Sequence, residues 1–377
     1  MSRDAEIAGF LARHGYARAR AAPLAQDASF RRYLRVTGGP RPVVLMDAPP
    51  PEDVRPFLRI AVHLAGVGLS VPEIVAVDET AGLVLEEDFG DGLYPTLLGE
   101  GGDISSPPPP VGGGWGEGSV PGSHRSLCRT NPSPQPPPTR GGGETPPTPT
   151  TPLFDTAIDA LVSMHRATPP PDLPTWNATA MRDTALATFL DWWWPATFGA
   201  PAPPAARTDF TAGLTELLAP IAAGPSGFIH RDYFAGNLLW LPDRDGPRRV
   251  GVIDFQGASL GHPAYDLVSL LQDSRRAIPA PIEAHSMARY LAARPELDAA
   301  AFRAAYVACA AQRQLRLVGQ WVRLARRDNR PAYLAYGPHT WALLNDALRH
   351  PAAAPLAAAM DRWIPPAHRA NPPNLVA

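Results

Sequence analysis

The chain contains no lysine. All 34 of its Lys+Arg positions are therefore arginines, in a sequence of 377 residues. The accompanying excess of alanine, proline and arginine is typical of coding bias in a GC-rich genome, which is the simplest cause. A site in this protein that needs a fixed positive side chain must therefore use a guanidinium group, which binds phosphate and carboxylate through two parallel hydrogen bonds.

Cysteine is also scarce. The two cysteines, Cys128 and Cys309, offer neither a disulfide framework nor the spacing of metal ligands. The first residues include Arg3, Asp4 and Glu6 and lack the apolar core of a signal peptide. No later apolar run approaches the roughly 20 residues that a membrane helix needs. We therefore expect a cytoplasmic protein that does not bind a membrane.

A strong charge of either sign is missing as well. The formal net charge is -2 at pH 7, and 19% of the residues are charged. No overall basic field is present to attract nucleic acid or an anionic membrane surface. We therefore expect a small-molecule substrate, no nucleic-acid partner and a monomer.

Residues 1–100 are predicted to form a small lobe built on an antiparallel sheet. Two segments with alternating apolar residues, 30–36 and 42–46, flank the turn signal Gly38-Gly39-Pro40, a pattern typical of a β-hairpin. The other elements expected in this lobe are helices at 4–14 and 54–65 and strands at 74–77 and 83–86.

Residues 101–152 break every regular pattern. Runs such as Pro107 to Pro110 and Gly141 to Gly143 cannot bury enough apolar surface to offset the entropy of the chain. We predict a disordered insertion between two lobes. A docking role remains an alternative, because proline-rich segments bind SH3-like grooves.

Residues 153–377 are predicted to form a larger, mainly helical lobe. Apolar residues recur at helical spacing from Leu153 onward, and one β-hairpin interrupts the helices at 238–254. The fold class is therefore α+β, with a β-rich lobe followed by an α-rich lobe. The long helices are expected at 263–275, 282–293, 299–327 and 339–348.

The strongest functional signal is a set of polar residues around the predicted hairpin. Asp232 follows His230 and Arg231, Asn237 comes five residues later, and Asp254 ends the second strand. This order matches the kinase spacing H-R-D-x-x-x-x-N with D-F-G. Each residue alone could simply cap a helix or a turn. Together they predict Asp232 as catalytic base and Asn237 with Asp254 as ligands of Mg²⁺, because the hairpin returns the chain to the same ion.

These segments resemble the aminoglycoside phosphotransferase family, whose fold is similar to that of protein kinases. The resemblance covers nearly the whole chain except 101–152, and within the family it is closest to the anomeric kinases of N-acetylmuramate and N-acetylglucosamine used in cell-wall sugar recycling. It implies an ATP-dependent kinase that phosphorylates the C1 hydroxyl of these amino sugars. The further segments that carry it are 27–36, 44–50, 87–91, 261–267 and 312–319.

The resemblance also implies roles for individual positions. The loop from Asp27 to Arg32 would fold over the ATP phosphates, and the hinge from Glu86 to Phe89 would read adenine through its backbone. Asp266 would hold the catalytic loop in place. The residues expected to contact the nucleotide are Ser29, Phe30, Arg31, Arg32, Glu86, Glu87, Asp88 and Phe89.

One position departs from the wider kinase pattern. Where a kinase presents a lysine to the α- and β-phosphates, this chain has Leu45, Met46 and Asp47. The phosphates still need a countercharge besides Mg²⁺, and we expect Arg31, Arg32 or Arg35 to supply it. Alternatively, these arginines only solvate one face of a strand.

The acceptor is less clearly indicated. The predicted helix at 302–327 carries six arginines and no acidic residue, which favours an anionic or neutral acceptor over a polycationic one, although helical charges usually face water. Trp192, Trp193 and Trp194 could stack on a sugar ring or pack in the core. Two alternatives stay open: a kinase of the same fold acting on an aminoglycoside, a choline-like amine or homoserine, and a nucleotide-binding scaffold without turnover. The arginines of this helix include Arg313, Arg316, Arg323, Arg326 and Arg327.

Overall fold

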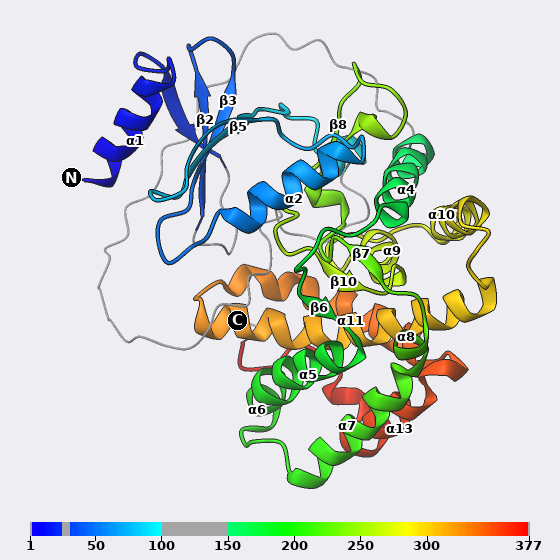
Figure 1. The fold of residues 1–377 in the computed structure, drawn as a ribbon. Helices are drawn as coiled ribbons and strands as arrows, with labels where there is room; N and C mark the ends of the chain where they lie inside the picture. The colour runs from blue at the N-terminus through cyan, green and yellow to red at the C-terminus, as the bar shows by residue number, and fades with distance from the viewer. Residues whose placement is uncertain (1, 25–30, 100–149, 376–377) are drawn as a thin grey trace.

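The protein folds into two lobes, a small one built on a sheet and a larger helical one (Figure 1). The computed structural model describes residues 2–24, 31–99 and 150–375. The sheet has five antiparallel strands in the order β1-β2-β3-β5-β4, which confirms the predicted class of the small lobe. The strands are β1 (Arg20–Pro23), β2 (Arg32–Thr37), β3 (Val43–Asp47), β4 (Ile74–Asp78) and β5 (Leu83–Glu87).

The two faces of this sheet carry different side chains. Helix α1 (Arg3–Arg13) packs on one face through an apolar cluster that includes Phe10 and Leu45 (Figure 1). In the β2-β3-β5 register Tyr33, Met46 and Val84 lie opposite one another and belong to the core shared with the large lobe. Side chains alternate along a strand, so Arg32 and Asp47 face α1. The residues on the inner face, toward the large lobe, include Arg31, Tyr33, Arg35, Met46, Val84 and Glu86.

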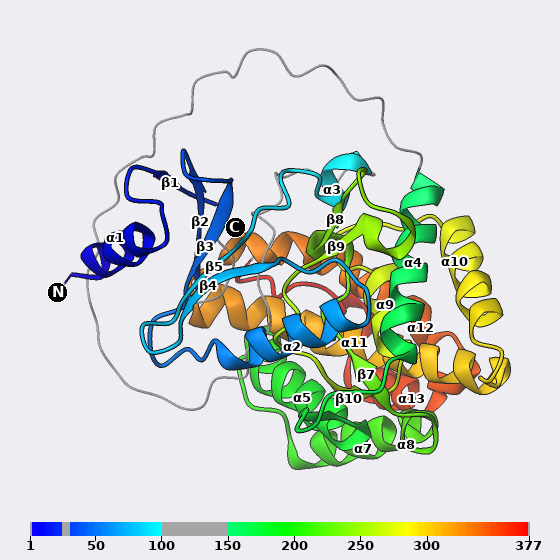
Figure 2. The ribbon, with the colours of Figure 1, turned by 45° about the horizontal axis from the view of Figure 1, so that its top comes forward.

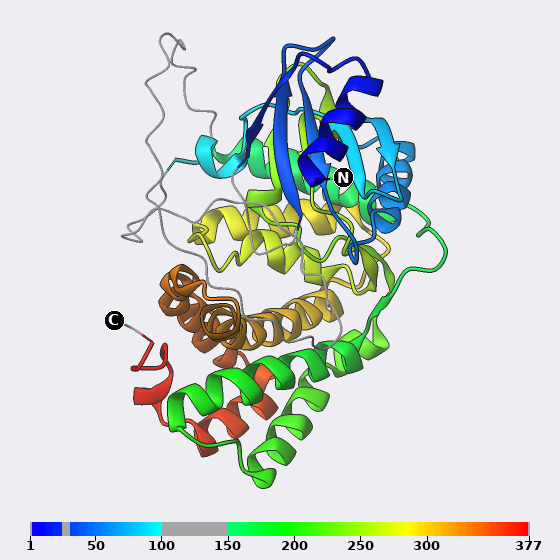
Figure 3. The ribbon, with the colours of Figure 1, turned by 90° about the vertical axis from the view of Figure 1, so that its left-hand side faces the viewer.

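The large lobe is organised around its longest helix, α11 (Ala299–Arg327), which packs against α5, α9 and α12 (Figure 3). The four helices expected from the sequence are present as α9 to α12, but α9 ends at Leu271, four residues before its predicted end. The helices described in this lobe besides α11 are α4 (Thr150–Arg166), α5 (Ala178–Thr188), α6 (Trp194–Phe198), α7 (Pro204–Leu217), α8 (Ala219–Ala223), α9 (Ala264–Leu271), α10 (Ala280–Ala293), α12 (Gly337–Leu348) and α13 (Ala354–Trp363).

Short paired strands flank the loops of the large lobe that carry the candidate site residues. The predicted hairpin is confirmed as β8 (Leu238–Trp240) paired antiparallel with β9 (Val250–Val252). A second group of strands runs in the order β6 (Thr175–Trp176), β10 (Ser259–Gly261), β7 (Gly227–Ile229). The loop between β7 and β8 and the loop after β9 carry the polar residues singled out in the sequence.

The two lobes are joined by direct contacts. In the small lobe, α2 (Arg55–Gly66) places Phe57 on Phe255, with ring centroids 4.8 Å apart and planes 14° apart. The Val252 N–H donates to the Ser70 carbonyl at 2.8 Å, and the Trp240 N–H donates to the Gly92 carbonyl at 2.7 Å. Figure 2 shows α2 lying along the large lobe and short helix α3 (Tyr94–Leu97) next to the β8-β9 hairpin.

The domain boundaries predicted at 100 and 152 stay predictions. The expected insertion at 101–152 lies almost wholly outside the described residues, and α4 begins at Thr150. Two residues of the tryptophan triplet lie in the core: Trp193 is buried and stacks on Phe189 with ring centroids 4.7 Å apart, and Trp194 is buried too, whereas Trp192 is half-buried against the core. None of the described helices is long and apolar enough to span a bilayer.

Candidate active site

A buried carboxylate holds the loop that follows β7. Asp266, in the first turn of α9, accepts hydrogen bonds from the His230 N–H at 2.6 Å and the Arg231 N–H at 2.8 Å. Arg231 has a positive φ of 74°, a conformation that costs energy for a residue with a side chain. The two hydrogen bonds stabilise this turn, which agrees with the role that the resemblance implied for Asp266.

His230 braces the same loop from within. Its Nδ1 accepts from the Asp232 N–H at 3.3 Å, so its Nε2 carries the hydrogen and donates to the Ile253 carbonyl at 3.1 Å. Burial lowers the pKa of His230, which keeps the ring neutral in this arrangement. The histidine therefore ties the loop of Asp232 to the strand that leads to Asp254.

Asn237 joins the two predicted functional loops. Its Nδ2 donates to the Asp232 carbonyl at 3.0 Å and to Asp254 Oδ2 at 3.2 Å. Its side chain is fully buried, and its Oδ1 has no hydrogen-bond partner among the described residues. Both amide hydrogens are thus used for positioning, and the amide oxygen is left for a ligand.

The side-chain oxygens of Asn237 and Asp254 are suitable ligands for Mg²⁺. The ion prefers hard oxygen ligands and is usually held by one or two carboxylates together with substrate phosphates and water. The Asn237 oxygen and the Asp254 carboxylate supply such a pair, and Gln256 donates to Asp254 Oδ1 at 2.5 Å. Asp254 has a positive φ of 62°, which its short polar side chain tolerates. No cluster of three or more His, Cys, Asp or Glu side chains suited to a metal occurs within residues 2–24, 31–99 and 150–375.

Asp232 lies beside this pair. Its backbone carbonyl is held by Asn237 and by the Phe234 N–H at 3.1 Å. Its carboxylate accepts no hydrogen bond from the described residues, and Gly257 is adjacent, since a Cβ built there would lie 4.0 Å from Asp232 Oδ2. The structure therefore brings Asp232, Asn237 and Asp254 together, as the sequence predicted.

The residues predicted to contact the nucleotide are only partly described. Ser29 and Phe30 lie outside the described residues. Arg31 is buried on the inner face of the sheet, where its Nε donates to Glu52 at 3.0 Å. Glu86 shares this face, and burial raises its pKa to about 8, although the positive charge of Arg31 opposes the shift.

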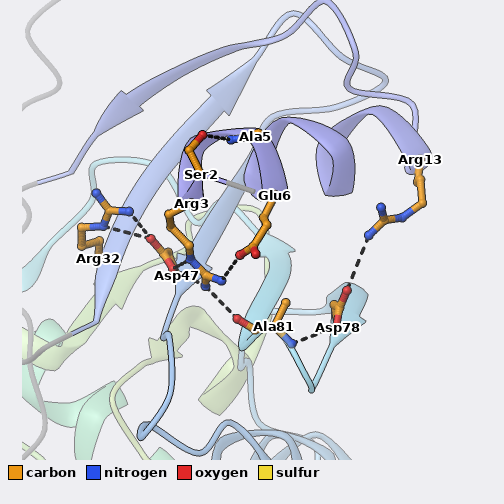
Figure 4. A network of polar contacts seen from close by, with 9 residues as sticks. All are labelled: Ser2, Arg3, Ala5, Glu6, Arg13, Arg32, Asp47, Asp78 and Ala81. Atoms are coloured by element: carbon orange, nitrogen blue, oxygen red, sulfur yellow. Dashed lines mark hydrogen bonds and ion pairs between the residues drawn. The ribbon is translucent and has the colours of Figure 1, made fainter.

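Arg32 and Arg35 have different surroundings. Arg32 faces α1 and forms an ion pair with the buried Asp47, which also pairs with Arg3 at 2.5 Å (Figure 4). Arg35 faces the inner side and pairs with Asp88 at 2.7 Å and Asp91 at 2.7 Å. Of the three candidate arginines, Arg32 is thus on the opposite face from the other two.

The predicted hinge contacts the β8-β9 hairpin. Glu87 pairs with Arg244 at 2.5 Å, and the Arg244 guanidinium lies 5.1 Å from the centre of the Phe89 ring. A Cβ on Gly251 would come within 2.7 Å of the Phe89 ring. Only glycine therefore lets the hinge approach the hairpin this closely.

Comparison with known protein families identifies the family of this chain. The family described as "Phosphotransferase enzyme family" matches residues 20–100 and 139–303. The chain belongs to this phosphotransferase family. A relative named N-acetylmuramate/N-acetylglucosamine kinase from Caulobacter vibrioides is 34% identical, with 96% of this chain and 97% of the relative covered. A protein of the same name from Pseudomonas aeruginosa is 29% identical over 89% of this chain and 86% of its own.

Solved structures confirm the two-lobed phosphotransferase fold. A choline/ethanolamine kinase family protein from Mesorhizobium loti superposes with a TM-score of 0.57 at 17% identity, covering 95% of this chain and 98% of its own. An aminoglycoside 2'-phosphotransferase bound to GDP superposes with a TM-score of 0.54 at 12% identity, over 92% of this chain and 98% of its own. The prediction of a protein-kinase-like fold is confirmed.

The burial of two arginines in this phosphotransferase was not expected from the sequence. Arginines of a helix usually face water, yet Arg313 and Arg316 of α11 are buried, at 1% and 4% exposure. The local sequence contained no clear signal, because the polar residues Gln312, Gln314 and Gln320 alternate there with apolar ones and are buried as well.

Proposed function

We propose that this phosphotransferase is an ATP-dependent kinase that phosphorylates the anomeric C1 hydroxyl of N-acetylmuramate and N-acetylglucosamine. The observation that carries the proposal is the Asn237 amide, which joins the loop of Asp232 to Asp254 and leaves one oxygen for a metal. The name carried by its relatives supports the choice of acceptor. The expectations of a cytoplasmic monomer with Mg²⁺ as cofactor stay part of the proposal.

In the proposed reaction, Asp232 accepts the proton of the C1 hydroxyl as the oxygen attacks the γ-phosphate. Its open lone pairs and its rigid backbone suit a general base. Asn237 and Asp254 would hold Mg²⁺, which when bound neutralises charge on the phosphate oxygens. The phosphoryl group passes to the sugar, ADP leaves, and no covalent enzyme intermediate is needed.

We propose Arg31 as the countercharge that replaces the kinase lysine. It is on the inner face of the sheet, next to the loop expected over the phosphates, and its guanidinium is buried. Arg32 is on the α1 side and is held by Asp47, so this position supports a structural role for it. Arg35 pairs with two carboxylates and donates to the Gly90 carbonyl at 3.1 Å. We therefore propose that Arg35 stabilises the backbone turn at Gly90.

The proposal is tested by incubating the purified chain with Mg-ATP and each of five acceptors: N-acetylmuramate, N-acetylglucosamine, choline, homoserine and an aminoglycoside. Phosphorus NMR of the product distinguishes a C1 phosphate from a C6 phosphate. We expect C1 phosphate from the two amino sugars and none in an Asp232→Asn control. If another acceptor is phosphorylated in preference to the two amino sugars, the protein is a kinase with a different substrate. Tight ATP binding without any product would indicate a nucleotide-binding scaffold.

A further inference from the structure

Arg313 is a buried cation without a partner. It lies in the middle of α11, it is 1% exposed, and its Nε and Nη1 make no hydrogen bond within the described part of the chain. Burial lowers the pKa of Arg313, and the neighbouring Arg316 and Arg275 lower it further. A buried charge that is neither paired nor hydrogen-bonded is costly. Such a residue is therefore expected where a ligand completes its coordination.

Other arginines surround the same place. Arg316 donates to the Tyr265 hydroxyl at 3.2 Å, and its guanidinium carbon lies 5.9 Å from the centre of the Trp176 ring. The Arg231 guanidinium carbon lies 4.0 Å from the centre of the same ring. Trp176 thus links the arginines of α11 to the catalytic loop.

The remaining neighbours of Arg313 offer little negative charge. The Arg275 guanidinium carbon lies 4.1 Å from the centre of the Phe234 ring. Tyr265 and Asp273 act in the opposite direction and raise the pKa of Arg313, but Asp273 Oδ1 already accepts the Arg275 backbone N–H at 3.0 Å. Four arginines therefore converge near one carboxylate that is engaged elsewhere.

This arginine group borders the acceptor side of the site. Arg231 immediately precedes Asp232, and Phe234, under Arg275, follows it by two residues. The α11 helix belongs to the large lobe, whereas Arg31 and the nucleotide hinge belong to the small lobe. An anion bound by α11 would thus be held by the large lobe, which also carries Asp232, and not by the sheet of the small lobe.

We propose that Arg313, together with Arg316 and Arg231, forms a subsite for a carboxylate of the acceptor. The inference rests on the proposed function, whose two sugars differ in this respect: N-acetylmuramate carries a lactyl carboxylate on O3, and N-acetylglucosamine has a hydroxyl there. Guanidinium groups bind carboxylates bidentately. The subsite would make the enzyme more efficient with the acidic sugar.

The test compares the two sugars in an Arg313→Met variant, which keeps the length of the side chain and removes its charge. We expect kcat/KM for N-acetylmuramate to fall about 10- to 100-fold, mainly through KM, while kcat/KM for N-acetylglucosamine and KM for ATP change less than about threefold. The matched control is Arg303→Met, because Arg303 is an exposed arginine of the same helix. It should leave both sugars unaffected.

A second arm needs no variant. The carboxamide of N-acetylmuramate is a neutral analogue of the acid, and wild-type enzyme should use it about 10- to 100-fold less efficiently than the acid. Equal use of acid and amide overturns the subsite, even if Arg313→Met fails to fold. Equal losses for both sugars with a raised KM for ATP would assign Arg313 to the phosphates instead. If wild-type enzyme phosphorylates neither sugar, the proposed function has failed rather than the subsite alone.

Discussion

Replacing Asp266 by alanine tests whether the catalytic loop depends on a single buried carboxylate. The substitution removes the acceptor of two backbone N–H groups, at 2.6 and 2.8 Å, and that of His165 Nε2 at 3.1 Å. A buried donor left without a partner costs about 1–3 kcal/mol. The two backbone donors, on His230 and Arg231, are therefore expected to lower the free energy of unfolding by about 2–6 kcal/mol.

The same change should reduce turnover more than nucleotide binding. Without Asp266, the strained turn at Arg231 relaxes and Asp232 leaves its position, so kcat should fall at least about tenfold while KM for ATP changes little. Urea unfolding and steady-state kinetics measure the two effects. The control is Asp243→Ala, an exposed aspartate in the turn between β8 and β9. An Asp266→Ala enzyme that matches the control in both stability and kcat would refute the argument.

Three further substitutions have distinct readouts. Asp232→Asn should lower kcat about 10²- to 10⁴-fold without altering the melting temperature, and an unchanged kcat would remove the proposed base. Glu86→Gln should flatten the dependence of stability on pH: the folded pKa is raised from 4.5 to about 8, so the stabilising contribution of Glu86 is fully present below pH 4.5 and is lost, by roughly 3 to 6 kcal/mol, as pH rises from 4.5 to 8. Parallel pH profiles of variant and wild type, measured by urea unfolding, would contradict this. Gly319→Ala should cost about 1–3 kcal/mol, because its Cβ would lie 2.3 Å from the Thr188 backbone, whereas Gly66→Ala, with open space around it, should not destabilise; calorimetry compares the two.

The proximity of the three candidate site residues could be predicted because their geometry is local. Asp232 and Asn237 are five residues apart on one loop, and a hairpin of ordinary length returns the chain to Asp254. The long helices were predictable for a similar reason, since their apolar spacing extends over several turns. Strands β1, β6, β7 and β10 were missed because each has only two to four residues, and such short strands depend on distant partners.

The sequence could not assign the individual arginines. Arg31 and Arg32 are adjacent, so on a strand they point to opposite faces, and only the register of β2 with β3 decides which one points inward. Asp47 gains its two partners from Arg3 and Arg32, one of which is 44 residues away. Arg313 was expected in water because charged residues are almost never fully buried without a partner. Its burial is visible only when helices from distant parts of the chain are packed together.

The stacked rings of Phe57 and Phe255 have a mechanical consequence. Phe57 belongs to α2 of the small lobe, and Phe255 is the residue next to Asp254. Close-packed rings transmit displacement rather than absorb it. A rotation of the small lobe would therefore pull on Asp254, so that, if Asp254 holds magnesium as proposed, separation of the lobes to release ADP and weaker metal binding would occur as one movement.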